Sequence, residues 1–328
     1  MVRLSCVCLS MVLLAACGTT LKAERRESAL YSFEQERPGT SLLDVSIPDE
    51  VLARAPNDFG NIAGLVSKTL RDTIDAQGGF MAFDKTDLGF KGTWDRGALR
   101  PVEGVPAGVQ TPLVTLVRVV DWRTVVETYG KQTRDVARVH LVLSTWTREG
   151  KEVSTDDIEV VATAGVNQRS IRTNHERVLS WYRTMYDDFS APTLNTRAEL
   201  FMAALRDAMA LHCYPFFSHR PVVRYSLMDD EPLKPGVQAA LSGNYDEAQA
   251  LWLAVAEKDP AAHGALYDAA VIHAIKGDDE AAYRLLVRAM NIEDKYLYLV
   301  LRSDVEARLT LRKKIMPDGM VLIGVLPK

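Results

Sequence analysis

The chain has 328 residues, of which 47% are hydrophobic and 25% are charged. This composition is typical of globular proteins, and the length is sufficient for two domains with cores of their own. The formal net charge of -4 at pH 7 gives no indication of the basic surface by which proteins bind nucleic acid, so no nucleic-acid partner is expected.

The segment at positions 1–16 has the pattern of a secretory signal peptide. Arg3 supplies a positive charge, the run from Leu4 to Leu14 is apolar, and Ala15 and Ala16 are small. Because such a run is too short to span a bilayer as a mature helix, cleavage is favoured. An uncleaved anchor or a buried hydrophobic helix is the alternative for this stretch.

The residues that end this segment, Leu14-Ala15-Ala16-Cys17, resemble the lipobox of bacterial lipoproteins. The resemblance implies cleavage before Cys17 and attachment of a diacylglyceryl group to its sulfur, with further acyl chains such as palmitate. Multiple chains would hold the protein stably on a membrane. Gly18 stands where an aspartate would retain enteric lipoproteins in the inner membrane, so the resemblance implies an outer-membrane protein, expected to face the periplasm.

Residues 17–28 are polar and charged, and we expect them to form a lipidated tether, with order beginning near Ala29. Residues 29–228 have the patterns of strands and amphipathic helices. The expected elements are a strand at 42–48, a helix at 59–77, strands at 113–120, 137–146 and 152–163, helices at 171–189 and 193–214, and a strand at 221–227. Gly89 to Val109 is rich in glycine and proline and is expected to be a loop. These patterns predict an α+β domain in which helices cover a sheet.

The order of these elements is similar to that of periplasmic lipoproteins with the curli-secretion or TolB-type N-terminal fold. The shared features are a lipidated cysteine, an opening strand, a helix that ends at Gly78-Gly79-Phe80, a run of strands and a late helix. One group of these lipoproteins carries tetratricopeptide repeats at the C-terminus. The resemblance implies a two-part architecture over residues 29–300 and brings no catalytic motif with it.

One pattern occurs twice in the C-terminal part of the chain. The segment from Gly243 to Ala248, followed by Trp252, returns as Gly277 to Ala282, followed by Leu286. The offset equals the period of about 34 residues that is typical of tetratricopeptide repeats. The positions of the glycine, the alanine and the large apolar residue resemble that family as well. The resemblance implies that residues 229–316 form a helical module that binds proteins. Its expected helices are at 236–241, 244–257, 262–275, 279–290 and 294–315.

Two repeats fall short of the roughly three that an independent array needs. The module is therefore expected to pack against the α+β domain or against another subunit. Residues 317–328 contain the run from Gly319 to Leu326, which is too apolar to remain in water. We expect this run to be a strand added to the sheet, or else a segment donated to a partner.

Repeats of this family bind peptides in the groove that their first helices line. The resemblance places five residues of the second repeat in this groove, and these are the predicted partner-binding residues: Tyr267, Asp268, Val271, Ala274 and Ile275. Asp268 would repel a C-terminal carboxylate, so an apolar or basic segment is the expected ligand. Alternatively, the last helix and the N-terminal domain cover this face.

Recognisable catalytic patterns are missing from the sequence. It contains no phosphate-binding loop, no Gly-x-Ser-x-Gly segment, no His-Glu-x-x-His and no Cys-x-x-Cys, so neither enzyme activity nor a cofactor is expected. His212, Cys213 and His219 are of metal-binding types, but His212 and Cys213 would project about 100° apart on a helix, and no metal is predicted. Asp156 and Asp157 are expected to lie in a solvated turn.

Two functions of different kinds remain open. The first is a membrane-anchored periplasmic lipoprotein that acts as a protein–protein interaction or assembly scaffold in an envelope complex. The second is an accessory lipoprotein of a transport system that binds a small molecule or lipid. The second function requires an apolar pocket inside residues 29–227, with the loop at 89–109 at its mouth.

Overall fold

The computed structural model describes residues 19–34, 39–55, 61–76, 82–84, 94–95, 98–101, 111–166, 169–186, 194 and 196–327. The protein is of the α+β class, with a sheet followed by a helical C-terminal region. It divides into two compact units, which we call the helical unit (Met1–Glu27, His219–Thr310 and Val325–Lys328) and the sheet unit (Ser28–Ser218 and Leu311–Gly324). Cys17 lies outside the described residues, so its lipidation stays a prediction.

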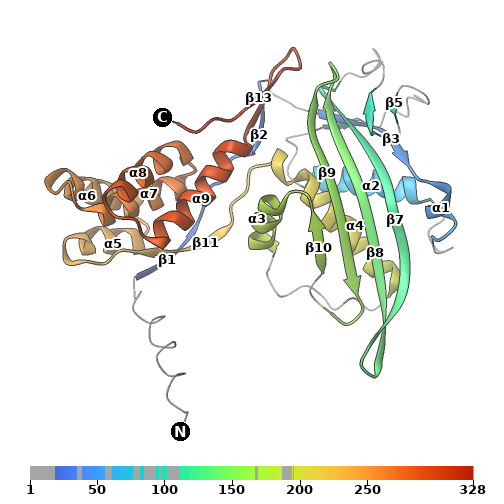
Figure 1. The fold of residues 1–328 in the computed structure, drawn as a ribbon, viewed down its shortest axis with the longest axis horizontal. Helices are drawn as coiled ribbons and strands as arrows, with labels where there is room; N and C mark the ends of the chain where they lie inside the picture. The colour runs from blue at the N-terminus through green and yellow to red at the C-terminus, as the bar shows by residue number, and fades with distance from the viewer. Residues whose placement is uncertain are drawn as a thin grey trace, which may run out of the picture. The chain divides into compact units, whose positions relative to one another are not determined.

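A six-stranded sheet forms the centre of the sheet unit (Figure 1). The strand order is β10-β9-β8-β7-β3-β4, antiparallel from β10 to β7 and parallel from β7 to β4. The strands are β3 (Gly39–Ser46), β4 (Ala82–Asp84), β7 (Leu113–Tyr129), β8 (Gln132–Thr147), β9 (Glu152–Thr163) and β10 (Ser170–Thr173). The meander predicted from the alternating apolar residues is present, and β9 has the predicted bounds.

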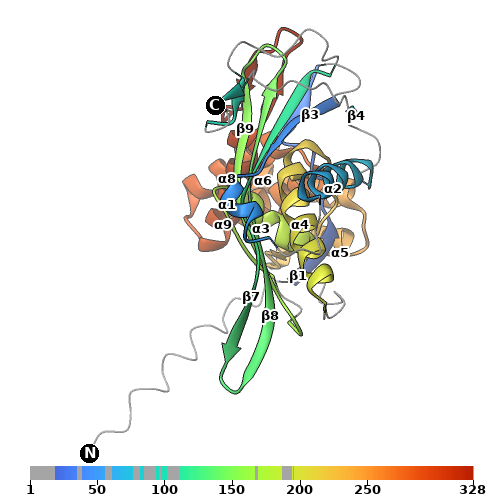
Figure 2. The same ribbon diagram turned by 90° about the vertical axis from the view of Figure 1, so that its right-hand side faces the viewer.

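The hairpin of β7 and β8 is longer than the sequence patterns predicted. The strands pair from Leu113 opposite Thr147 to Tyr129 opposite Gln132, around a turn in which Gly130 has a φ of 63°. The predicted strand ended early because the second half of β7 mixes charged, polar and apolar residues and contains no long apolar run. Figure 2 shows the turn end of this hairpin extending beyond the helices of the unit.

Helices pack on one face of this sheet. They are α2 (Ile62–Ala76), α3 (Glu176–Tyr186) and α4 (Arg197–Cys213), and the chain also has a short helix α1 (Asp49–Leu52) and a 3-10 turn η2 (Tyr214–Phe216). α4 crosses β8 and β9, and α2 packs on α4. α4 begins with a capping box: the Thr196 hydroxyl accepts a hydrogen bond from the Glu199 N–H, and the Glu199 carboxylate accepts one from the Thr196 N–H. The helix predicted at 171–189 is wrong at its start, because Ser170–Thr173 pairs with β9 instead.

Two smaller sheets complete the sheet unit. One has the order β13-β12-β2, formed by β13 (Val321–Ile323), β12 (Lys313–Ile315) and β2 (Tyr31–Phe33). The strand predicted near the C-terminus is therefore present, but it is short and joins this small sheet. The other pairs β5 (Trp94–Asp95) with β6 (Arg100–Pro101) inside the predicted loop at 89–109. Most of that loop lies outside the described residues.

The helical unit contains two helix pairs at a fixed offset. They are α5 (Lys234–Leu241) with α6 (Tyr245–Lys258) and α7 (His263–Lys276) with α8 (Asp279–Ile292); a 3-10 turn η3 (Glu231–Leu233) precedes them and α9 (Tyr296–Leu311) follows. Both ends of α8 follow those of α6 at the offset of the sequence repeat. Trp252 of α6 is fully buried, and its Nε1 donates to the Leu233 carbonyl at 3.1 Å. This ring fills the space beside Gly236, so α5 and α6 approach closely there.

The predicted tether at 17–28 is wrong for its described part. Thr19–Glu24 forms β1, which pairs antiparallel with β11 (Val222–Leu227) inside the helical unit. Leu21 and Ala23 alternate with exposed Lys22 and Glu24 and join the core of the helices. The strand predicted at 221–227 thus exists. The predicted boundary after residue 228 placed it in the α+β domain, but it belongs to the helical unit.

Substitution of the two repeat glycines by alanine is expected to have unequal costs. Gly243 and Gly277 have φ values of 81° and 80°, but a Cβ at Gly243 would meet nothing within 4 Å, whereas one at Gly277 would lie 2.5 Å from the Arg26 carbonyl oxygen. We expect Gly243→Ala to lower the free energy of unfolding by about 1 kcal/mol, and Gly277→Ala by about 2 kcal/mol or more. Urea denaturation of both variants measures this, and equal losses would contradict the packing of Arg26 on α7.

Candidate functional site

The five predicted partner-binding residues lie on α7, inside the helical unit. Tyr267, Asp268, Val271, Ala274 and Ile275 are all 3% exposed or less. The Tyr267 hydroxyl donates to the Ser226 carbonyl of β11 at 3.0 Å. Their side chains therefore belong to the core of the helical unit, and a partner could reach them only by displacing segments that pack on α7, such as β11. Their binding role stays a prediction.

Asp268 is the most unusual of these residues, because it is a fully buried carboxylate. One of its oxygens accepts a hydrogen bond from the Met228 backbone at 3.0 Å, and no described residue hydrogen-bonds to the other. Burial raises the pKa of Asp268 well above its usual value, and the nearby carboxylates of Asp229 and Asp230 raise it further. Asp268 thus holds the turn after β11 in place through its hydrogen bond with Met228.

A pocket of about 460 Å³ opens on the surface of the helical unit, beside the start of α7. Apolar and small residues form much of its wall, among them Leu233, Val255 and Ala262, and Asp230 and Asp259 place carboxylates in it. His263 also lines the pocket; it hydrogen-bonds with the Tyr298 hydroxyl at 2.7 Å and lies 2.5 Å from a Glu293 oxygen. An apolar lining with a few polar groups is the usual character of a binding site.

The sheet unit contains a different polar centre, a buried carboxylate between two histidines. Asp156 of β9 lies 2.8 Å from His175, which precedes α3, and its other oxygen hydrogen-bonds with Nδ1 of His212 on α4. Burial alone would raise the pKa of Asp156, but the hydrogen bonds and charges of the two histidines hold it below its usual value. The hydrogen bond to Asp156 raises the pKa of His175. The three side chains join β9, α3 and α4.

Three threonine hydroxyls extend this centre across the sheet. Thr145 of β8 lies 3.3 Å from Nε2 of His212, and hydrogen bonds of 3.2 and 2.9 Å connect it to Thr115 of β7 and then Thr40 of β3. His212, Asp156 and Thr145 have the order of a catalytic triad, but they are 3%, 5% and 1% exposed. A substrate cannot reach the Thr145 hydroxyl in this arrangement, so the chain of hydrogen bonds stabilises the fold.

The prediction of a solvated turn at Asp156 and Asp157 is wrong. Both residues lie within β9, where Asp157 is exposed and Asp156 points to the helices. The sequence contained the signal, since Asp156 is in phase with Ile158, Val160 and Ala162, which are all buried. Cys213 is buried, which raises its pKa and makes it unreactive. Within the described residues, no group of three potential ligands has the arrangement of a metal site.

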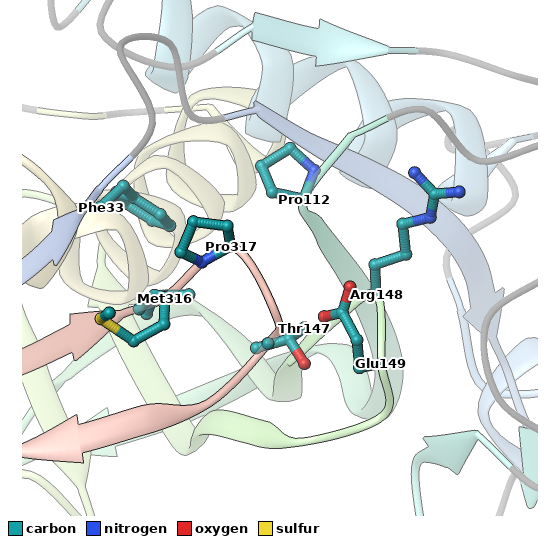
Figure 3. A pocket seen from close by; sticks show the side chains of 9 residues that line it. Phe33, Pro112, Thr147, Arg148, Glu149, Met316 and Pro317 are labelled. Carbon is teal, nitrogen blue, oxygen red and sulfur yellow. The ribbon is translucent and has the colours of Figure 1, made fainter.

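A small polar pocket lies at the end of the sheet unit where the turn after β8 meets the turn after β12. In Figure 3, Arg148 and Glu149 line one side, and Phe33, Met316 and Pro317 line the other. Its volume of about 80 Å³ accommodates a few water molecules, whereas ligand pockets usually span about 300–1,000 Å³. This pocket is too small for the ligand that the second predicted function requires.

The core of the sheet unit is also filled where the structure describes it. Leu141 and Leu143 of β8 point to α4 and are fully buried, and the Trp122 ring stacks on Phe201 with 5.2 Å between centroids. The predicted mouth of an apolar pocket at 89–109 falls mostly outside the described residues. The sheet unit also has a pocket of about 600 Å³ beside the β12–β13 hairpin, lined by Lys151, Glu152, Lys313, Asp318, Met320, Val321 and Ile323. This pocket lies at the surface, where Ile323 is exposed, and not in the predicted apolar interior.

Comparison with known proteins adds little to these observations. No protein-family model and no curated protein matches the chain. A hypothetical protein from Chlamydia trachomatis aligns with 55% of this chain and 98% of its own at 12% identity, with a TM-score of 0.31. A minor lipoprotein from Acinetobacter baumannii aligns with 56% of this chain and 97% of its own at 10% identity, with a TM-score of 0.22. No helix in the described ranges is long and apolar enough to cross a membrane.

Proposed function

We propose that this protein is a lipid-anchored lipoprotein of the bacterial outer membrane that faces the periplasm and acts as an interaction scaffold in an envelope complex. The anchor is the lipid on Cys17. Because β1 begins at Thr19, two residues, spanning at most about 7 Å, connect this anchor to the helical unit. The helical unit is therefore held close to the membrane surface.

The helical unit is the part that binds a protein partner, as a tetratricopeptide-type module. The observation that carries this proposal is the pair of helix hairpins, whose helices α6 and α8 have the same length and follow each other at the period of such repeats. Modules of this type serve as binding scaffolds in many proteins. The partner binds at the pocket beside the start of α7, since the predicted groove residues are buried and this pocket is open.

The proposal predicts that filling this pocket releases the partner. Ala262 lines the pocket and is half-buried, whereas the adjacent Ala261 is exposed and does not line it. We expect Ala262→Trp to reduce recovery of the crosslinked partner from cell envelopes at least about tenfold, as expected for the loss of a central contact, and Ala261→Trp to leave it unchanged. Equal thermal unfolding of both variants controls for folding.

The lipid anchor has its own test. Cys17→Ser is expected to abolish metabolic labelling with palmitate and to move the protein from the outer-membrane fraction to the periplasmic fraction. Outer-membrane fractionation of Cys17→Ser at the wild-type level would refute the anchor. Failure to recover any reproducible partner from crosslinked wild-type envelopes would refute the scaffold role.

A further inference from the structure

The last helix of the helical unit takes the position of the first helix of a third repeat. α9 begins 33 residues after the start of α7, at Tyr296 against His263, and it ends 35 residues after the end of α7, at Leu311 against Lys276. Residues 312–327, all of which the structure describes, contain the strands β12 and β13 and no helix. The second helix of this third repeat, the counterpart of α8, is therefore missing.

One face of α9 attaches it to the rest of the helical unit. The Tyr298 ring stacks on Tyr267 of α7 with 4.7 Å between centroids, and Arg308 donates to Asp279 of α8 at 2.7 Å. Figure 1 shows α9 beside these two helices. The residues of this attached face are all 6% exposed or less: Tyr298, Leu301, Val305, Arg308 and Leu309.

The opposite face of α9 is apolar as well, but it is exposed. Tyr296 is 82% exposed, and Leu299 and Val300 are each 48% exposed. Their spacing of three and four residues places them on one stripe, which at 100° per residue lies opposite Val305 and Leu309. A helix that ends an array has a polar outer face. α9 instead has the composition of a helix with a neighbour on both sides.

The equivalent positions in the complete repeat are covered. At the repeat period of about 34 residues, Leu299 and Val300 correspond to Ala265 and Leu266 of α7, which are both buried. α7 packs against both α6 and α8. Because α9 contacts α8 as α7 contacts α6, what the exposed face of α9 lacks is a helix in the position of α8.

The exposed face of α9 is self-complementary in size. The large Tyr296 stands at its start, whereas Ser303 and Ala307, which are half-buried, are small and stand farther along the same face. When two such faces meet antiparallel, the start of one lies against the end of the other. Each tyrosine ring then enters the space above the two small residues of the other copy, as a knob enters a hole, and the two Val300 side chains meet near the centre.

We propose that α9 pairs with α9 of a second copy of this chain, antiparallel, with the two-fold axis near Val300. Each copy then supplies the helix that the third repeat of the other lacks. A two-fold contact of this kind joins the same surface of both subunits and closes the assembly as a dimer. The face spans only a few helical turns and is smaller than a standard interface, so we expect a dissociation constant of roughly 1–100 µM.

Charges placed at the two-fold axis test the dimer directly. In Val300→Glu two carboxylates meet near the axis, and in Val300→Lys two ammonium groups meet there, so each variant alone is expected to dimerise at least about tenfold more weakly than the parent chain. An equimolar mixture of the two variants joins opposite charges and is expected to form a mixed dimer. Sedimentation of the chain from residue 17 onward with Cys17→Ser, which carries no lipid and needs no detergent, measures all samples.

The mixture is also the folding control, because two misfolded variants would not rescue each other. A parent chain that sediments as a monomer well above the expected dissociation constant would overturn the proposal and leave the face to a different protein. Single variants that dimerise as the parent chain does, or a mixture that stays monomeric, would overturn it as well.

A short bismaleimide crosslinker tests the antiparallel register. Packed helices have axes about 8–10 Å apart, so Val300→Cys, near the two-fold axis, is expected to form a crosslinked dimer. Thr310→Cys, at an exposed position of the same helix, is the matched control, because its two copies would lie about 30 Å apart along the helices. Cys213 is buried and does not interfere. Crosslinking at Thr310 as efficient as at Val300, or none at Val300, would overturn the register.

Discussion

Replacement of Asp156 by alanine is expected to lower the free energy of unfolding by about 3–5 kcal/mol, as is usual when one partner of a buried ion pair is removed. Asp156 is 5% exposed and hydrogen-bonds with both His175 and His212. Its loss would leave His212 buried without the acceptor at Nδ1 and would separate β9 from α3 and α4. Urea denaturation followed by circular dichroism measures the effect.

The neighbouring residue provides a matched control for this variant. Asp157 lies on the other face of β9, where its exposed carboxylate is 2.6 Å from His140. Exposed pairs contribute about 0–1 kcal/mol, so Asp157→Ala is expected to have a small effect. If the two variants lost equal stability, the buried centre would not hold the sheet unit together.

The contribution of Asp156 to the free energy of unfolding should also depend on pH, with a maximum in the mildly acidic range. The pKa of His175 is raised by its hydrogen bond to Asp156. The stabilisation from this histidine is therefore fully present below about pH 6.5 and is lost as the pH rises through the raised value. The pKa of Asp156 is lowered. The stabilisation from its carboxylate is therefore fully present above about pH 4 and is lost as the pH falls through the lowered value. The stability difference between wild type and Asp156→Ala is therefore largest between about pH 4 and 6.5.

The second large effect is expected at Arg25, in the segment that the sequence assigned to a tether. Arg25 is 5% exposed, pairs with the buried Glu27, and donates to Asp304 of α9 at 2.7 Å and to the Tyr225 hydroxyl at 3.3 Å. Arg25→Met keeps much of the apolar contact but removes the cation that two carboxylates face. We expect it to lower the free energy of unfolding by about 3 kcal/mol.

Two further variants separate this effect from a general sensitivity of the segment. Arg26 is exposed, so Arg26→Met is expected to change the free energy of unfolding by less than about 0.5 kcal/mol. The double variant Arg25→Met with Glu27→Gln should recover part of the loss, because it no longer buries a carboxylate beside the missing cation. Protease cleavage between residues 19 and 27 in Arg25→Met alone would show that the segment has detached. Full resistance with unchanged stability would contradict the role of Arg25.

Much of the local structure followed from the residues themselves. The helix at α2, the strand β9 and the helices of the repeat were predicted close to their observed bounds, because apolar residues at intervals of two or near 3.6 define a buried face without reference to the rest of the chain. Gly243 and Gly277 marked the turns of the repeat, because the left-handed backbone conformation of such turns favours glycine whatever surrounds it.

Pairings between distant segments could not be predicted in this way. Thr19–Glu24 has the polar composition of a linker, and only β11, about 200 residues later, makes it a strand with a buried face. Likewise, no local pattern connects Asp156 with His175 and His212, and the charged second half of β7 becomes a strand because β8 pairs with it.

The sequence by itself determined the signal-like segment at positions 1–16 with Cys17 after it, the α+β class and the C-terminal sequence repeat, because each of these depends on neighbouring residues alone. The tertiary structure decided which surfaces remain available. It buried the predicted groove of α7 and left open the pocket beside Ala262. The physical reason is that exposure is a property of what packs against a residue, and the segments that pack there come from distant parts of the chain.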